Sequence, residues 1–422
     1  MAVGLGMSIG TIHTVCAVAA AAGRPAPQPA TRRTTLTFDS SGAVRVGRIP
    51  RHGRMITDFA DLTQRPAPGA RVCHRTLTAA DLVATVAGSM CAEVLGAPDT
   101  AAVLGVPRAA EMRGAPRAAE MRGVPRAAAA MDAIRASAAM SVQRAAAARV
   151  AVTHPVGCPA ARVTELRAAL DTAGLEAALL VAEPIAAAAW LSATHGPLLP
   201  GLALVYDLGG SGLSVTLVRV GAGLPPGPIV GTPVRSAEFG GRAFGAEVSR
   251  RAARLVAAGS ADRLTDAATG ELRTAHVRRS LTEVYRCLRL ADVTMADVDR
   301  VLVVGGAARP PEVAAVLAEA LARPVVVARE PERTIAEGAA ILARRAAEVA
   351  HGDAVRRRRA GRARTARVVR RRVVRAAALV GAAVAAVALL AAVPGDCART
   401  TTGSLGAVLQ SDTDTMQSPH GT

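Results

Sequence analysis

Four apolar runs in this chain of 422 residues end at glycine turns or acidic residues that could take part in phosphate chemistry. They are VGLGMSIGTIHT (residues 3–14), LVAEPIAAAAW (180–190), LVYDLGGSGLS (204–214) and VLVVGGAARPP (301–311). Glycines that follow a strand let backbone N–H groups approach phosphate oxygens with no side chain in the way. One such turn is weak evidence, so the prediction of a phosphate site rests on their recurrence.

Other common chemistries lack their motifs in this chain. The 8 histidines are dispersed, and none stands in an HExxH pattern. The chain has neither a GxSxG elbow nor a GxxxxGKS/T loop, which argues against a hydrolase triad and a P-loop enzyme. The 6 cysteines form no CxxC pair, so we expect reduced, mostly buried thiols and no zinc site. Aromatic residues make up 2% of the chain, too few for a base-stacking nucleic-acid platform.

Strands alternate with helices along most of the chain, a pattern typical of an α/β domain. A second, similar lobe begins at residue 201. The expected strands lie within residues 3–18 (a hairpin), 34–46, 149–155, 204–207 and from 301 onward. The expected helices cover residues 78–95, 160–173, 276–290, 312–322 and 334–349.

A nine-residue unit is repeated three times within residues 105–131, as GVPRAAEMR, GAPRAAEMR and GVPRAAAAM. Each unit opens with proline and closes before glycine, the usual order for the start and end of a helix. Nine residues is not the period of a solenoid. We interpret the repeat as a surface insertion in the first lobe and assign it no function.

This order of motifs resembles the actin-like ATPase (ribonuclease-H-like) fold, and within it the nucleotide-binding domain of DnaK-type heat-shock chaperones. The resemblance covers residues 3–347 and is most extended at residues 148–191, where a strand, a helix and a Glu-Pro-x-Ala-Ala-Ala helix start follow one another. Asp207-Leu208-Gly209-Gly210 resembles the second phosphate loop of the family, and Val304-Gly305-Gly306 with Arg309 resembles its adenosine motif. The resemblance implies a two-lobed α/β fold that binds ATP and Mg²⁺.

Residue roles carried over from the family are implied by this resemblance alone. Thr11 belongs to the first phosphate loop, Glu183 orients the attacking water or the water shell of the metal, and Asp207 acts near Mg²⁺ through water. Phosphate and adenosine would be held by Gly10, Gly209, Gly210, Gly240, Gly241, Gly305, Gly306 and Arg309. A purely structural interpretation makes Glu183 an acid favoured by the helix dipole and Asp207 a turn residue.

The chain departs from the family pattern at several positions. Ser8 and Ser214 stand where the family has aspartates, and the chain contains no lysine where a lysine normally faces the transferring phosphate. Arg65 could replace that lysine in charge but not in shape. Only about 35 residues separate Gly241 from His276, where the family has a subdomain that clamps adenosine. The loss of each such group lowers the rate of reaction by about 10² to 10³, so we do not expect efficient hydrolysis.

Residues 376–393, AAALVGAAVAAVALLAAV, are uncharged and apolar, and we expect them to form a single transmembrane helix about 27 Å long. Eleven of the 51 basic residues lie between Arg356 and Arg375 with no acid among them. The positive-inside rule then places the N-terminal domain in the cytoplasm and residues 394–422, expected to be disordered, outside. The competing interpretation of residues 2–22 as a signal peptide lacks a basic start and a continuous apolar core.

The Arg356–Arg375 run would contact anionic lipid head groups beside that span. A nucleic-acid role for the run is a weaker alternative, and we expect no specific nucleic-acid binding. The predicted organisation is a first lobe (1–200), a shortened second lobe (201–349), a basic linker (350–375), the span (376–393) and the outer tail (394–422).

The sequence therefore predicts a protein of the cell membrane with a DnaK-like, ATP-binding domain and a chaperone-like or regulatory role. No β-rich peptide-binding domain is evident after residue 349. The alternative is a catalytically inactive pseudo-ATPase scaffold that binds an unknown protein partner at the membrane. The sequence leaves it open whether the chain is an enzyme.

Overall fold

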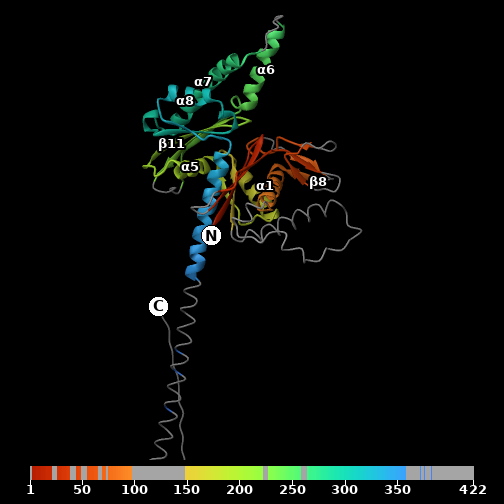
Figure 1. Cartoon of the computed structure of the whole chain (residues 1–422), viewed down its shortest axis with the longest axis vertical. Coiled ribbons are helices and arrows are strands. Elements are labelled where there is room, and N and C mark those ends of the chain that lie inside the picture. Colours follow the sequence, from red (N-terminus) through yellow and green to blue (C-terminus); the bar gives the residue numbers. More distant parts are fainter. Residues whose placement is uncertain are drawn as a thin grey trace, which may run out of the picture. The chain divides into compact units, whose positions relative to one another are not determined.

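The computed structural model describes residues 2–20, 26–38, 44–48, 55–64, 69–72, 75–96, 148–221, 227–257 and 264–357, and the single positions 371, 375 and 382. Contacts divide the chain into two compact units, Met1–Ala354 and Val355–Thr422. The first unit contains both predicted lobes (Figure 1). The second is described at residues 355–357, 371, 375 and 382, which are all helical. The nine-residue repeat, Arg65 and, apart from Ala382, the expected membrane span lie outside the described residues.

The first lobe is built on a five-stranded sheet in the order β10-β9-β1-β2-β3. β2 runs antiparallel to both β1 and β3, whereas β9 and β10 continue the sheet in parallel on the other side of β1. The strands are β1 (Val3–Ile9), β2 (His13–Ala19), β3 (Ala30–Arg33), β9 (Ala148–His154) and β10 (Leu179–Ala182).

Helices and two small sheets complete this lobe. One small sheet pairs its strands in the order β5-β4-β6, and the other is a hairpin of β7 and β8. The remaining elements are β4 (Leu36–Phe38), β5 (Val44–Val46), β6 (Met55–Ile56), β7 (Gly69–Val72), β8 (Arg75–Thr78), α1 (Ala79–Gly96), α4 (Ala160–Thr172) and α5 (Glu183–Thr194).

The second lobe repeats this arrangement, with a sheet in the order β13-β12-β11-β14-β15. Its first three strands are antiparallel, and β14 and β15 follow in parallel, as β9 and β10 do in the first lobe. The elements are β11 (Gly201–Leu208), β12 (Leu213–Val220), β13 (Ile229–Ser236), α6 (Gly241–Ala257), α7 (Asp266–Leu290), η3 (Met295–Asp297), β14 (Arg300–Val304), η4 (Gly306–Ala308), α8 (Pro311–Leu321) and β15 (Val325–Val327). A last helix covers residues 334–357.

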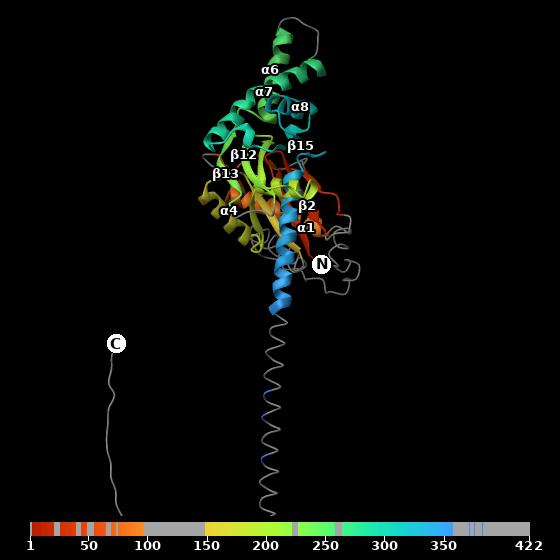
Figure 2. The same cartoon turned by 90° about the vertical axis from the view of Figure 1, so that its left-hand side faces the viewer.

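The last helix of each lobe packs against the other lobe. Helix α5 shares a buried cluster with Ala203 and Val205 of β11. Helix 334–357 lies beside β2 (Figure 2) and shares a buried cluster with its Val15 and Ala17. Close approach of that helix requires Gly6, because a Cβ there would collide with the backbone of residues 336–340. The lobes are thus joined by an exchange of helices, which fixes the facing edges of their two sheets.

Helix α1 is, within the described residues, the one helix long and apolar enough to cross a membrane, with 67% of that span buried in the fold. Its Leu82, Val86 and Met90 side chains are fully buried in the core of the first lobe. The packing explains the apolar composition of α1 as that of a core helix.

Most of the expected elements are present, including the hairpin at the start of the chain, α1, β9, α4 and α8. The helix expected over residues 276–290 is wrong at its start, because α7 begins at Asp266. Thr265 caps it by accepting a hydrogen bond from the N–H of Ala268. Between Gly241 and His276, where the sequence left the structure unassigned, most of the described residues belong to α6 and to the first part of α7.

Candidate functional site

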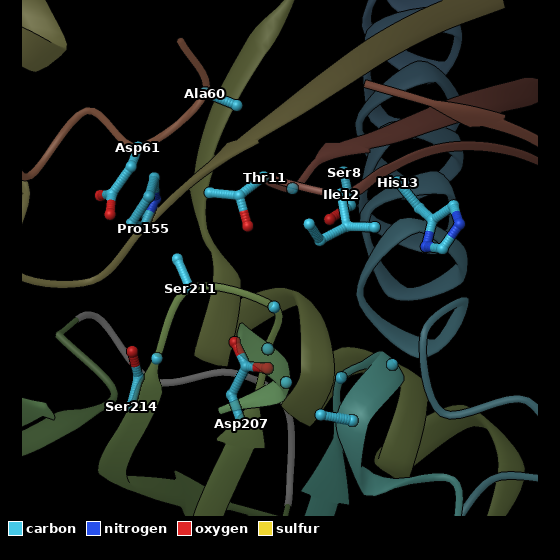
Figure 3. A pocket seen from close by; sticks show the side chains of 18 of the residues that line it. Ser8, Thr11, Ile12, His13, Ala60, Asp61, Pro155, Asp207, Ser211 and Ser214 are labelled. Atoms are coloured by element: carbon cyan, nitrogen blue, oxygen red, sulfur yellow. The ribbon is translucent and has the colours of Figure 1, made fainter. Parts of the chain in front are cut away.

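A cleft of about 450 Å³ lies between the two lobes. The β1–β2 turn, with Thr11 and Ile12, forms one wall, and the β11–β12 turn, with Ser211, forms the facing wall (Figure 3). Both turns occupy the same position in their sheets, between the first two antiparallel strands. The exchange of helices between the lobes therefore brings two equivalent hairpin turns face to face.

Residues of both turns line the cleft, and several of their backbone N–H groups are left without a partner among the described residues. Those of Thr11, Gly210 and Ser211 have no hydrogen-bond partner within the described part of the chain. The turns also touch, since a Cβ on Gly210 would collide with the side chain of Ile12 and lie 3.2 Å from Thr11 Oγ1. Unpartnered N–H groups next to side-chain-free backbone form the kind of concavity that binds an anion.

Two acidic side chains lie on the floor of the cleft. Glu183 is the first residue of α5, directly after β10, and Asp207 is near the end of β11. Burial raises the pKa of Glu183, and the neighbouring Asp207 carboxylate raises it further. Burial also raises the pKa of Asp207, while the Arg235 guanidinium opposes both shifts. Burial therefore makes ionisation of both carboxyl groups less favourable than in water, and a cation bound beside them would favour it.

The acid pair bears on whether Mg²⁺ fits this cleft. Within the described ranges no group of three or more His, Cys, Asp or Glu side chains is placed to hold a metal ion. Mg²⁺ keeps several of its waters, however, and is usually held by one or two carboxylates together with substrate phosphates. Glu183 and Asp207 supply that number of carboxylates, so these residues fit an ion that enters with a phosphate ligand.

Nine of the eleven residues predicted for the site line the cleft, whereas Gly240 and Arg309 do not. The nine are Gly10, Thr11, Glu183, Asp207, Gly209, Gly210, Gly241, Gly305 and Gly306. Gly240, with φ +121°, supports the second turn from beneath, where a Cβ would lie 2.7 Å from the N atom of Gly212. The guanidinium of Arg309 pairs with Glu332, which does line the cleft.

Several of these glycines shape the turns, and their own N–H groups are already hydrogen-bonded within the protein. The N–H of Gly209 donates to the Gly212 carbonyl, that of Gly241 to the Gly209 carbonyl, and that of Gly305 to the Pro331 carbonyl. Gly305 has φ +95°, and a Cβ on it would lie 2.6 Å from Asp207 Oδ1. Glycine at 305 is therefore required for the Asp207 carboxyl to keep its place.

Two of the departures noted in the sequence, Ser8 and Ser214, are buried serines. Ser8 in β1 is 8% exposed, and Ser214 in β12 is 5% exposed and stands directly opposite Asp207 in the sheet register. Both line the cleft (Figure 3). The cleft therefore holds hydroxyl groups at the two positions where the resemblance noted in the sequence would place carboxylates.

Sequence reasoning missed Asp61 and Arg235, which both line the cleft. Arg235 is on β13 directly across from Ser214, and Asp61 follows β6 in the first lobe. One signal could have found Arg235: it lies five residues before the Gly240-Gly241 pair. From that position in β13 its side chain reaches the second turn. No local pattern marks Asp61, because its role depends on contact with the other lobe.

Residues 256–355 match the family model described as Hsp70 protein. The matched range contains α7, β14, α8, β15 and most of helix 334–357, and so includes Gly305, Gly306 and Arg309. It supports an Hsp70-type family for this part of the chain. The mixed α/β architecture, with two sheets of one topology, fits an Hsp70 ATPase-like fold. No curated protein matches the chain.

Proposed function

We propose that this chain is a DnaK-like protein that binds ATP with Mg²⁺ in the cleft between its lobes and acts as a chaperone-like regulator at a membrane. The observation that carries the nucleotide assignment is the pair of facing hairpin turns, with unpartnered N–H groups above the Glu183–Asp207 pair. Members of the Hsp70 family bind ATP and Mg²⁺, and the match over residues 256–355 points to the same ligands here.

The residues of the cleft take separate roles in this proposal. The N–H groups of Thr11, Gly210 and Ser211 bind phosphate oxygens, and Gly305 and Gly306 border the nucleoside. Glu183 and Asp207 hold waters of the ion, which neutralises charge on the phosphates. In turnover, Glu183 would orient the attacking water and Thr11 would contact the transferring phosphate.

A second candidate function is a pseudo-ATPase scaffold that binds a protein partner and hydrolyses nothing. Buried Ser8 and Ser214, in place of carboxylates, favour it over turnover. Loss of one electrostatic catalytic group lowers the rate of reaction by about 10² to 10³. Loss of two would leave so little hydrolysis that an active ATPase and a scaffold are easily told apart.

Calorimetric titration of the full chain with Mg-ATP tests nucleotide binding. We expect binding in the low-micromolar to millimolar range, weakened at least tenfold by Asp207→Ala. Absence of heat from folded protein at millimolar ATP would contradict the proposal. Single-turnover assays with labelled ATP then separate the two functions, because the scaffold leaves bound ATP intact.

Membrane attachment is part of this proposal and rests on the sequence. The apolar run 376–393 would cross the bilayer, with the Arg356–Arg375 segment on the cytoplasmic side against anionic lipid. Flotation with liposomes and protease protection of the C-terminal tail test the attachment and its orientation. Full release of the chain by alkaline carbonate would contradict a transmembrane span.

A further inference from the structure

The guanidinium of Arg235 contacts the second turn, and its hydrogen bonds define what it can do. The guanidinium donates from Nη2 to Asp61 Oδ2 at 2.9 Å and to Ser211 Oγ at 3.3 Å. A longer contact of 3.4 Å joins Nη1 to Ser214 Oγ. A guanidinium has five N–H donors, so these three contacts leave donors free to face the cleft.

Asp61 holds this guanidinium from the opposite lobe. The Asp61 side chain is 7% exposed and that of Arg235 is 28% exposed. Asp61 Oδ1 also accepts hydrogen bonds from the N–H and the hydroxyl of Thr63, which fix the carboxylate in place. The Asp61–Arg235 pair therefore bridges the two lobes at the wall of the cleft.

The charge of Arg235 reaches the floor of the cleft. It opposes the rise in the pKa of both Glu183 and Asp207, which places the guanidinium within electrostatic range of both carboxyl groups. The chain has no lysine to serve this purpose, and the cleft lining includes one other arginine, Arg242. Arg242 pairs with Asp58, and their side chains are 45% and 52% exposed, so its charge is largely screened by water.

We propose that Arg235 binds the terminal phosphate of the nucleotide and that Asp61 sets the strength of this contact. The proposal deepens the proposed function and rests on it. Asp61 orients the guanidinium but also neutralises part of its charge, so Asp61 lowers the affinity of the cleft for polyphosphate. Ser214 makes this arrangement possible, because an aspartate at that position would pair with Arg235 from its own sheet.

The proposal predicts effects of opposite sign for the two members of the pair. Arg235→Ala removes a charged, forked donor and should weaken binding of Mg-ATP and of inorganic tripolyphosphate by about 10- to 100-fold. Arg235→Lys keeps the charge without the fork and should recover part of this loss. Asp61→Asn keeps the size of the side chain, removes the negative charge and should tighten binding by about 3- to 10-fold.

The experiment is a calorimetric titration of the full chain and these variants with both ligands. Arg219→Ala is the matched control, since Arg219 is an exposed residue of β12 and does not line the cleft. A structural role alone would make Asp61→Asn and Arg235→Ala both weaken binding, and that result would overturn the proposal. Arg235→Ala binding within twofold of the parent would overturn it as well.

The same titrations separate this inference from the proposed function. If the parent chain binds neither ligand while folded, the proposed function fails and the inference fails with it. If the parent binds ATP and the Arg235 variants bind equally well, the inference alone is wrong. Circular dichroism and melting of each variant confirm that the compared proteins are folded.

Discussion

The two lobes have one topology but supply different chemistry. β1 runs through Ser8 to Gly10 at its turn, and β11 runs through Asp207 to Gly209 at the corresponding place. The second lobe contributes two acidic residues, two arginines and most of the glycines that line the cleft, whereas the hairpin of the first contributes Ser8, Gly10, Thr11, Ile12 and His13. Both arginines of the cleft thus come from the second lobe, and the first lobe adds the acidic side chains of Glu183 and Asp61.

The largest expected effect concerns the packing of helix 334–357 against β1 of the first lobe. Gly6→Ala places a Cβ into the backbone of residues 336–340 and should destabilise the chain by about 3 kcal/mol. Urea unfolding measures the change. The control is Gly88→Ala in α1, where a Cβ meets nothing within 4 Å and should stabilise the helix by about 1 kcal/mol. Equal effects of the two substitutions would contradict the helix exchange.

Exchanging the residue types at the two turns should change stability with opposite signs. Ser8→Asp puts a carboxylate at a position that is 8% exposed and should cost about 2 kcal/mol in ligand-free protein. Asp207→Ser removes a carboxyl whose pKa is raised by burial and should stabilise ligand-free protein by about 1 kcal/mol. Thermal melting without nucleotide measures both. Destabilisation by both variants would contradict the expectation that a buried carboxyl group lowers the stability of ligand-free protein at both positions.

The contact between the lobes should depend on pH. Burial alone would raise the pKa of Asp61, but the hydrogen bonds from Thr63 and the charge of Arg235 bring it below the ordinary value. A lowered carboxyl pKa adds stability above the unfolded pKa of about 3.9, and this stability is lost as pH falls through the folded pKa. Asp61→Asn should therefore cost about 1–2 kcal/mol at pH 7, and this cost should fall as pH drops below the unfolded pKa of about 3.9.

Urea unfolding of the parent and Asp61→Asn at pH 7 and at pH 3 makes this comparison. Thr57→Ala, at an exposed hydroxyl that bonds only the neighbouring Asp58 among the described contacts, is a suitable control. A cost of Asp61→Asn that stays constant between pH 7 and pH 3 would rule out the charged pair.

The smallest effect concerns the crossing of the two exchanged helices. Trp190 of α5 donates from Nε1 to Glu337 Oε2 at 2.9 Å, and burial raises the pKa of Glu337. A raised carboxyl pKa lowers stability above the folded pKa, and stability recovers as pH falls through it. Glu337→Gln should therefore stabilise the chain by at most about 1 kcal/mol at pH 7 and have little effect near pH 4.

The chain has a single tryptophan, so Trp190 fluorescence reports directly on this contact. Its emission should stay unchanged in Glu337→Gln, because the amide oxygen still accepts the indole N–H. A large red shift in emission would mean that the carboxylate itself holds α5 and helix 334–357 together.

The predictable parts of the fold are those with local signals. The apolar run before Gly10 located the first hairpin, the run before Gly209 located β11 and its turn but not β12, and Glu183-Pro184 marked the start of α5. The start of α7 was missed, although Thr265-Asp266 is a capping signal, because the apolar spacing is clear only after His276. Asp61 and Arg235 are 174 positions apart, and a pair across two lobes leaves no trace in local sequence.

A crystal structure of the full chain with Mg²⁺ and a non-hydrolysable ATP analogue tests the central claim most directly. The account predicts the triphosphate between the Gly10–Ile12 and Gly209–Gly212 turns, with its terminal phosphate against Arg235 and the ion beside Glu183 and Asp207. A cleft that stays empty at saturating analogue, or nucleotide bound elsewhere on the chain, would contradict it.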